Sequence, residues 1–246
     1  MSAPAPSEPD ALLARIAADQ WGVVTLGDAR RCGLSRKAVM VRVRKGLIYP
    51  LHRGVFALGH PAIPLEGKML AAVKACGDGA ALSHFACCAH WDFVNWDGRE
   101  IEVIVSGSGT RVHAGIHVHR SELLPRSHLM THRGIFCTSP ARALIDMAAD
   151  APQEQVRGAI RRAMSLRRVS AQGLASALTR LGPRRGSAKV AKVLTAGYVP
   201  TRSELEDVVY ELICKGGFVP PDVNVPLRIG RRTAAGAPVI SGRLST

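Results

Sequence analysis

The sequence contains few aromatic residues. Phe, Trp and Tyr make up 4% of its 246 residues, whereas hydrophobic residues as a whole make up 47%, so the cores must be built mainly from Ala, Val and Leu. No apolar run approaches the roughly 20 residues of a membrane-spanning helix. The first nine residues lack the basic and apolar regions of an export signal. We therefore expect a globular, cytoplasmic protein with a disordered tail at residues 1–9 and no membrane partner.

Acidic residues are also in short supply. Nineteen Asp and Glu stand against 33 Lys and Arg, which gives a formal net charge of +14. Such an excess is typical of proteins that bind polyanions, and nucleic acid is the leading class. Two alternatives are an anionic membrane surface and a solvated surface without a partner. The position of the basic residues along the chain has to decide between them.

None of the six cysteines forms a Cys-x-x-Cys pair, which is the spacing of many zinc and redox motifs. Free thiols in a reducing cytoplasm are the simplest explanation. A mixed site is conceivable in which Cys87 or Cys88 joins His84 and His90, but nothing in the sequence fixes a tetrahedral set of ligands. We therefore predict no metal and no cofactor.

The first sixty residues carry the pattern of three short helices. Residues 11–20 have one apolar face, and Asp10 is placed to cap this first helix. Thr25 and Asp28 resemble a capping box at the start of a second helix, which Gly33 can end. A tight turn must follow directly, because the next helix signal comes two residues later.

A third helix is predicted from Ser35, its N-cap, to about Lys45. Val39 and Val43 are spaced to face the core, which leaves the basic side chains on the other faces, where a recognition helix meets the major groove of DNA. The basic side chains of this helix and of the wing that follows it supply the expected contacts. We expect six residues to bind DNA: Arg36, Lys37, Arg42, Arg44, Lys45 and Arg53.

Two β-prone runs, residues 47–51 and 55–58, come after this helix and predict a β-hairpin. A hairpin in this position is a wing, and Arg53 at its tip can reach a phosphate or the minor groove. Residues 28–53 hold eight Lys or Arg and one acid, so the charge lies where the motif needs it. The sequence thus predicts a winged helix-turn-helix that binds double-stranded DNA; the alternative is a basic helical hairpin packed on another domain.

The middle of the chain is predicted to mix helices and strands. Residues 65–76 and 81–91 have helical patterns, and residues 101–105 and 116–119 favour a β-hairpin. His117 and His119 would then share one face of a strand. They indicate either a metal-binding or pH-sensing group or the polar face of a half-buried sheet, and we adopt the second interpretation.

A basic helical stretch follows. Residues 155–203 hold eleven Lys or Arg and no acid, on three predicted amphipathic helices. Their arginines would form a second positive surface for the DNA backbone. A solvated face, or a face that pairs with an acidic protein, explains them equally well. Asp146, in the helix before this stretch, has no visible acidic partner and is interpreted as structural.

The run from residues 21–25 through residues 53–56 resembles the AbiE-type (AbiEi) antitoxin family, in which a winged helix-turn-helix precedes an antitoxin domain. Residues 82–84 with Trp91, and residues 138–142 with Asp146, are similar to later parts of those chains. The resemblance implies an antitoxin-like transcriptional regulator of a type IV toxin–antitoxin system. It further implies repression of its own promoter and a cognate toxin protein as second partner.

Residues 200–206 and 216–225 resemble the opening of a very-short-patch-repair endonuclease, a branch of the PD-(D/E)-x-K nucleases. The strands that carry the catalytic acids of those enzymes do not follow, since the last acid of the chain is Asp222. Glu204 and Glu206 on one helix cannot supply the converging carboxylates that hold a catalytic divalent metal. We expect a module truncated by a frameshift near Gly230, and no enzymatic activity; the rival interpretation is an incomplete, inactive DNA endonuclease.

The expected fold class is therefore α+β, with several parts in sequence order. They are a winged helix-turn-helix DNA-binding domain (10–60), an α+β antitoxin-like domain (61–150), a basic helical segment (151–197), the start of a nuclease-like domain (198–229) and a disordered tail (230–246).

Overall fold

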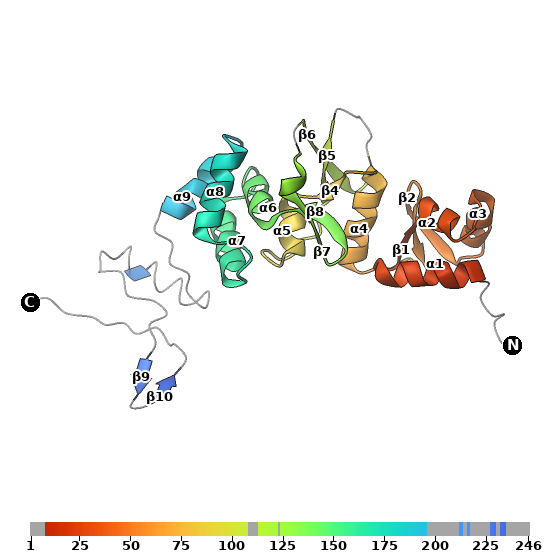
Figure 1. Cartoon of the computed structure of the whole chain (residues 1–246), viewed down its shortest axis with the longest axis horizontal. Coiled ribbons are helices and arrows are strands. Elements are labelled where there is room, and N and C mark those ends of the chain that lie inside the picture. The colour runs from red at the N-terminus through yellow and green to blue at the C-terminus, as the bar shows by residue number, and fades with distance from the viewer. Residues whose placement is uncertain are drawn as a thin grey trace, which may run out of the picture.

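The structure is a computed structural model of the chain, and the fold is α+β, as the sequence predicts. Figure 1 shows an elongated molecule with a small helix-and-strand unit at the N-terminal end, a sheet in the middle and a layer of helices beyond it. The residues that the structure describes are 8–107, 113–122, 124–195, 212–213, 216, 227–229 and 232–234.

The N-terminal unit, residues 8–58, combines helices with an antiparallel sheet of order β1-β3-β2. The predicted helices and the wing hairpin β2–β3 are confirmed, whereas strand β1 has too few residues to show a pattern in the sequence. Its elements are α1 (Glu8–Asp19), β1 (Val23–Thr25), α2 (Leu26–Arg31), α3 (Arg36–Arg44), β2 (Ile48–His52) and β3 (Val55–Leu58).

Polar side chains at the helix starts explain why α2 and α3 begin where they do. Thr25 Oγ1 accepts a hydrogen bond from Asp28 N at 3.0 Å, and Asp28 Oδ2 accepts one from Thr25 N at 2.7 Å, which is a capping box. At α3, Ser35 Oγ accepts from Ala38 N at 3.2 Å. Both predicted caps are confirmed, and together they fix the short α2–α3 turn.

Helix α4 (Leu65–Cys76) joins the N-terminal unit to the middle of the molecule. Val23 and Val55 of the small sheet belong to the same hydrophobic core as the buried face of α4. Gly67 allows this packing, because a Cβ there would lie 2.7 Å from the carbonyl oxygen of Trp21. The indole Nε1 of Trp21 also donates to Arg133 O at 3.0 Å. The packing at Gly67 and the hydrogen bond of Trp21 together hold the N-terminal unit against the central sheet.

The central sheet has five strands in the order β6-β5-β4-β8-β7. In Figure 1, α4 lies on one side of it and α5 and α6 lie on the other. The predicted helix over residues 81–91 begins late, because residues 81–82 form strand β4. The elements are β4 (Ala81–Leu82), α5 (His84–His90), β5 (Ile101–Ser106), β6 (Ile116–Ser121), the 3-10 turn η1 (Arg126–His128), β7 (Leu129–His132), β8 (Ile135–Thr138) and α6 (Pro140–Met147).

Strands β5 and β6 are parallel, with Ile101 beside Ile116 and Ser106 beside Ser121. The predicted β-hairpin is therefore wrong. Alternating apolar residues are common to both arrangements, so the pattern could not distinguish them. Gly115, the residue before β6, lies beside the first residue of β5, since Ile101 N donates to Gly115 O at 3.1 Å. The turn itself uses Gly115, whose φ is +74°.

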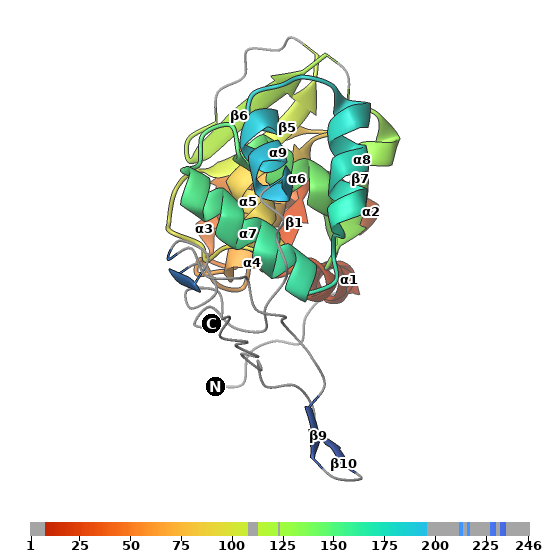
Figure 2. The ribbon, with the colours of Figure 1, turned by 90° about the vertical axis from the view of Figure 1, so that its left-hand side faces the viewer.

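The three helices predicted in the basic stretch are confirmed as α7 (Gln153–Ser165), α8 (Ala171–Leu181) and α9 (Ser187–Thr195). Figure 2 shows them in front of the sheet when the molecule is viewed from their end. Their apolar faces share one hydrophobic core with the central sheet. Gly186 precedes α9 with φ +88°, and a Cβ there would lie 2.5 Å from Ile145 O. The tight approach of α9 to α6 thus requires glycine.

At the C-terminal end, β9 (Leu227–Ile229) and β10 (Arg232–Ala234) form an antiparallel pair. Strand β10 falls in the predicted tail, residues 230–246. Most of the predicted nuclease-like segment and of both predicted tails lies outside the described residues. Within the part of the chain that the structure describes, no helix has the length and apolarity needed to cross a membrane. The division of the chain into domains stays a prediction.

Candidate nucleic-acid interface

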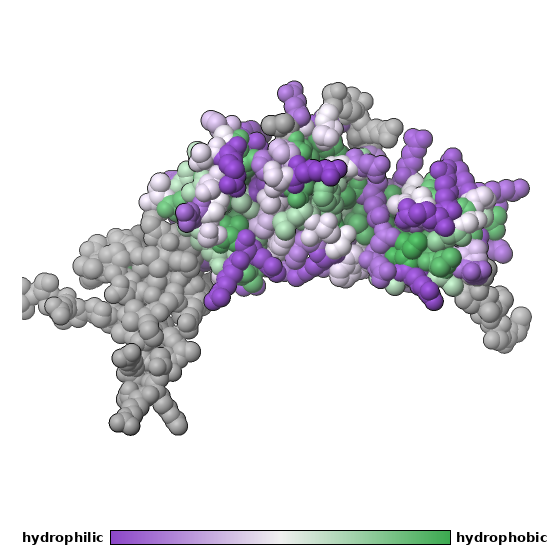
Figure 3. All heavy atoms as spheres, in the orientation of Figure 1, coloured by the Kyte–Doolittle hydropathy of each residue, from purple (hydrophilic) through white to green (hydrophobic). Residues whose placement is uncertain are grey.

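Helix α3 presents a basic surface to solvent. Val39 is buried, with 1% of its surface exposed, and Val43 packs against the same core, as predicted. On the other faces Arg36, Lys37 and Arg44 are exposed. Figure 3 shows hydrophilic side chains projecting from this end of the molecule. The burial of the two valines thus determines which residues α3 can offer to a partner.

A groove of about 680 Å³ lies between α3 and the wing; we call it the α3–wing groove. Arg36 and Met40 line it from α3, and Arg53 lines it from the tip of the wing. Its lining also includes His52 and His113. Burial, followed by the nearby imidazole of His113, lowers the pKa of His52. Two of the predicted DNA-contact residues, Arg36 and Arg53, therefore flank one concave surface.

Lys45 and Arg53 are exposed, like the three basic residues of α3 named above. Arg42 differs, because its side chain is 19% exposed and is bound to Asp10 of α1. Nε donates to Oδ1 at 2.7 Å and Nη2 donates to Oδ2 at 3.1 Å. Nη1 also donates to Ala38 O at 3.1 Å. The carboxylate of Asp10 raises the pKa of Arg42 through this hydrogen bond, so the guanidinium is committed to linking α1 and α3.

Asp10 is accordingly not the N-cap that the sequence predicts. Helix α1 already begins at Glu8, inside the segment predicted as a tail. Sequence reasoning missed the link from Asp10 to Arg42 because the two residues are 32 positions apart and only the packing of α1 on α3 brings them together.

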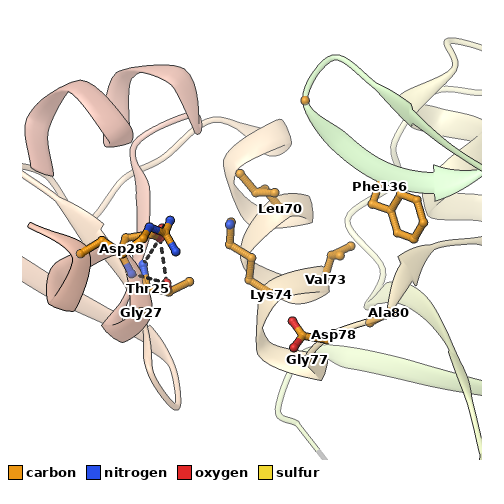
Figure 4. Close-up of a pocket in the computed structure, with 13 residues that line it drawn as sticks. Thr25, Gly27, Asp28, Leu70, Val73, Lys74, Gly77, Asp78, Ala80 and Phe136 are labelled. Atoms are coloured by element: carbon orange, nitrogen blue, oxygen red, sulfur yellow. Dashed lines mark hydrogen bonds and ion pairs between the residues drawn. The ribbon is translucent and has the colours of Figure 1, made fainter.

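A second hollow, of about 480 Å³, lies where the N-terminal unit meets α4. In Figure 4, Lys74 of α4 and the capping box of Thr25 and Asp28 occupy facing sides of it. Asp28 is 2% exposed, and its carboxylate is bound to Thr25 and to Arg31. This hollow is a polar junction between two packed units, and the carboxylate of Asp28 holds the start of α2.

Several arginines of the basic helical stretch make contacts within the protein. Arg185 pairs with Asp150 at 2.8 Å and Arg184 approaches Asp146 at 3.5 Å. Arg168 lies over the ring of Trp91, with 5.7 Å between its Cζ and the ring centroid. These contacts fasten the ends of α7 and α9 to their neighbours. The second DNA surface predicted here stays a prediction.

Asp146 is 5% exposed and is paired with Arg142 at 2.5 Å. Burial raises the pKa of the Asp146 carboxyl, while the charges of Arg142 and Arg184 oppose the shift. These contacts agree with the structural role that the sequence predicts. The pair with Arg142 lies within α6, and the contact of Asp146 with Arg184 joins α6 to the loop that precedes α9.

Three residues gather on one face of the sheet, although the sequence did not group them: His84, Glu102 and His119. The predicted neighbours His117 and His119 do lie together, with ring centroids 4.5 Å apart. Cys87, which the sequence suggested as a possible ligand together with His84, does not belong to this cluster. Its side chain is fully buried and bound to Thr138. Parallel pairing of β5 and β6 brings Glu102 beside the two β6 histidines, and no signal in the sequence reveals that pairing.

The N-terminal unit is similar to a known family of proteins. Residues 12–59 match the family of transcriptional regulators described as AbiEi antitoxin. The match runs from within α1 to just past β3, and so includes the residues of α3 and of the wing that line the α3–wing groove. It does not reach residues 198–229, and the nuclease likeness of that segment stays a prediction. No match is found among curated proteins.

A solved structure is similar over most of the chain. The RV2827C protein from Mycobacterium tuberculosis shares 18% sequence identity with this chain, with a TM-score of 0.51. The alignment covers 81% of this chain and 80% of that one. At this identity the likeness concerns the fold. It supports the α+β arrangement beyond the segment that the family model matches.

Proposed function

We propose that this chain is a DNA-binding transcriptional regulator that serves as the antitoxin of a type IV toxin–antitoxin system. The observation that carries the proposal is the α3–wing groove, where Arg36 and Arg53 flank one concave surface. The match of residues 12–59 to AbiEi antitoxin regulators supports the same function. A cognate toxin protein would be the second partner, and the cytoplasm is where both partners would be met.

In this proposal the N-terminal half of α3 enters the major groove. Residues at the N-terminal end of a recognition helix meet base edges, so Arg36 and Lys37 read sequence. Arg53 at the wing tip binds a phosphate or enters the minor groove. Arg44 and Lys45, at the other end of α3, lie where they can neutralise flanking phosphates.

We assign Arg42 a different role from the one that the sequence predicts for it. Its guanidinium is already bound to Asp10 and to Ala38 O. Leaving that pair for DNA would expose a carboxylate next to the phosphates. Arg42 therefore positions α3 on α1, and the five exposed residues make the DNA contacts.

The experiment is fluorescence anisotropy with the DNA upstream of the chain's own gene and with a shuffled duplex of equal length. Arg36→Ala should lower affinity for the upstream DNA by about 1–3 kcal/mol and reduce discrimination between the duplexes, as loss of a base contact does. Arg53→Ala should weaken binding to both duplexes alike, as loss of a phosphate contact does.

Arg15→Ala is the matched control, because Arg15 is exposed on α1 and lies outside the α3–wing groove. It should leave binding unchanged. Equal losses in Arg15→Ala and Arg36→Ala, or no loss in Arg36→Ala and Arg53→Ala, would contradict the proposed interface.

We also propose that the chain does not hydrolyse DNA. The support is chemical: phosphodiester hydrolysis with a divalent metal needs converging carboxylates, and the sequence has no acid after Asp222. Incubation of the purified chain with supercoiled plasmid and Mg²⁺ tests this directly.

A further inference from the structure

The cluster of His84, Glu102 and His119 draws one residue from each of three elements. His84 is the first residue of α5, Glu102 lies on β5 and His119 lies on β6. One potential ligand atom from each residue lies within 4.8 Å of the other two. All three side chains are partly buried. The fold therefore holds two imidazoles and one carboxylate around a small volume near the surface.

Each of these side chains is oriented by a second contact. His84 Nδ1 lies 3.0 Å from Ser83 Oγ, and Ser83 is completely buried. If Nδ1 carries the proton, Nε2 keeps its lone pair for a ligand. Glu102 Oε2 accepts a hydrogen bond from Ala86 N at 3.1 Å, which leaves Oε1 directed at His119 Nε2, 3.3 Å away. Such supporting contacts are typical of residues that ligate a metal.

The two imidazoles of the cluster are stacked on each other, and the neutral form of such a ring is the form that binds metals. The rings of His84 and His119 stack with centroids 3.4 Å apart and an interplanar angle of 11°, so two positive charges there would repel. The backbone of His84 has φ +50°, a conformation that residues other than glycine seldom adopt. His84, the residue whose ring completes the cluster, thus adopts an uncommon backbone conformation.

We propose that His84, Glu102 and His119 bind one divalent transition-metal ion of the zinc class. Two histidines and one carboxylate form a ligand set that zinc and non-haem iron sites use, with at least one position left for water or another ligand. Two nitrogen ligands out of three disfavour Mg²⁺ and Ca²⁺, which prefer oxygen. The inference departs from the sequence prediction of no metal because the parallel pairing of β5 and β6 assembles the site.

Binding requires a small rearrangement of the stacked rings. The lone pairs of two parallel imidazoles do not converge on one point, so one ring must tilt out of the stack. The proton that His119 Nε2 shares with Glu102 must also move to Nδ1, because a ligating nitrogen carries no proton. The bound metal would then tie α5, β5 and β6 together and stabilise the fold against unfolding.

The test uses the full chain stripped of metal with a chelator and titrated with Zn²⁺ by calorimetry. We expect one Zn²⁺ per chain and a rise in Tm on binding. His119→Gln and Glu102→Gln should each weaken Zn²⁺ binding by more than about 100-fold, because loss of a ligand exceeds the 10–100-fold effect of losing an outer contact. His60→Gln is the matched control, since His60 is exposed and hydrogen-bonded to Ala62, and it should bind Zn²⁺ like the wild type.

Two further measurements keep the test decisive. Circular dichroism of the metal-free variants establishes that they are folded, and Co²⁺ in place of Zn²⁺ reports nitrogen and oxygen ligation through its visible spectrum, which both ligand variants should lose. Wild type that binds no Zn²⁺, or folded His119→Gln and Glu102→Gln variants that bind it unchanged, would overturn the proposal. Equal affinity for Mg²⁺ and Zn²⁺ would overturn it as well.

Discussion

The ion pair between Asp10 and Arg42 should hold α3 in place without contacting DNA. Its atoms are well aligned, with N···O distances of 2.7 and 3.1 Å, but the two side chains are 35% and 19% exposed. Solvent screens a pair of this kind, so its coupling energy should be about 0.5–1 kcal/mol. For a chain of this size, a loss of 1 kcal/mol lowers Tm by about 2–4 °C.

The assay is a double-mutant cycle with Asp10→Ala, Arg42→Ala and the combined variant. Each variant is measured by thermal unfolding and by anisotropy with the upstream DNA. If the pair only positions α3, both single variants lose stability by similar amounts and weaken DNA binding by no more than about 5-fold, which corresponds to about 1 kcal/mol. The combined variant should then be little worse than either single variant.

The alternative role of Arg42 makes the opposite prediction. If Arg42 contacts DNA, Asp10→Ala frees its guanidinium and removes a negative charge, so binding should strengthen. Arg42→Ala should then weaken binding as much as Arg36→Ala does and reduce its salt dependence. That pair of results would refute the positioning role.

Three other predictions concern stability and activity. Gly186→Ala should lower the free energy of unfolding by roughly 2–4 kcal/mol, because its Cβ would lie 2.5 Å from a backbone oxygen at positive φ. The control Gly158→Ala, in open space on α7, should instead raise the free energy of unfolding by about 0.5–1 kcal/mol. Equal effects of the two substitutions in urea unfolding would contradict the packing of Gly186. Burial, followed by His90, lowers the pKa of His132 to about 4, so the neutral ring stabilises the fold above pH 6.5 and that contribution is lost as pH falls from 6.5 to 4. His132→Phe, which keeps the stack on Trp91, should therefore lose less stability than the wild type over that range. An identical pH profile of stability in the two proteins would refute the assignment. Supercoiled plasmid with Mg²⁺ should stay uncut, whereas nicking that Glu206→Gln abolishes would establish a nuclease.

Local signals in the sequence predicted the N-terminal unit well. The caps at Thr25 and Ser35 and the apolar spacing of Val39 and Val43 each depend on residues within one helical turn, and the structure contains all of them. Interactions of this kind can be identified from neighbouring residues alone. The helices of the basic stretch were predicted for the same reason.

Features that depend on distant residues could not be predicted. The parallel pairing of β5 and β6 has the same apolar alternation as a hairpin, and strand β4 is too short to show a pattern. Asp10 reaches Arg42 across 32 residues, and Glu102 meets His119 only through the parallel register. In both cases a basic or histidine side chain gained its partner from tertiary packing, which changed the role that the sequence suggests for it.

The salt dependence of DNA binding tests the central claim most directly. If Arg44, Lys45 and Arg53 neutralise phosphates, a plot of log K against log salt should have a slope of roughly −3, and affinity should fall roughly 40-fold between about 50 and 200 mM salt. The combined variant Arg44→Ala, Arg53→Ala should reduce the magnitude of that slope by about 2, while Arg15→Ala leaves it unchanged. A flat dependence in the wild type, or the same slope in the combined variant, would contradict DNA binding through α3 and the wing.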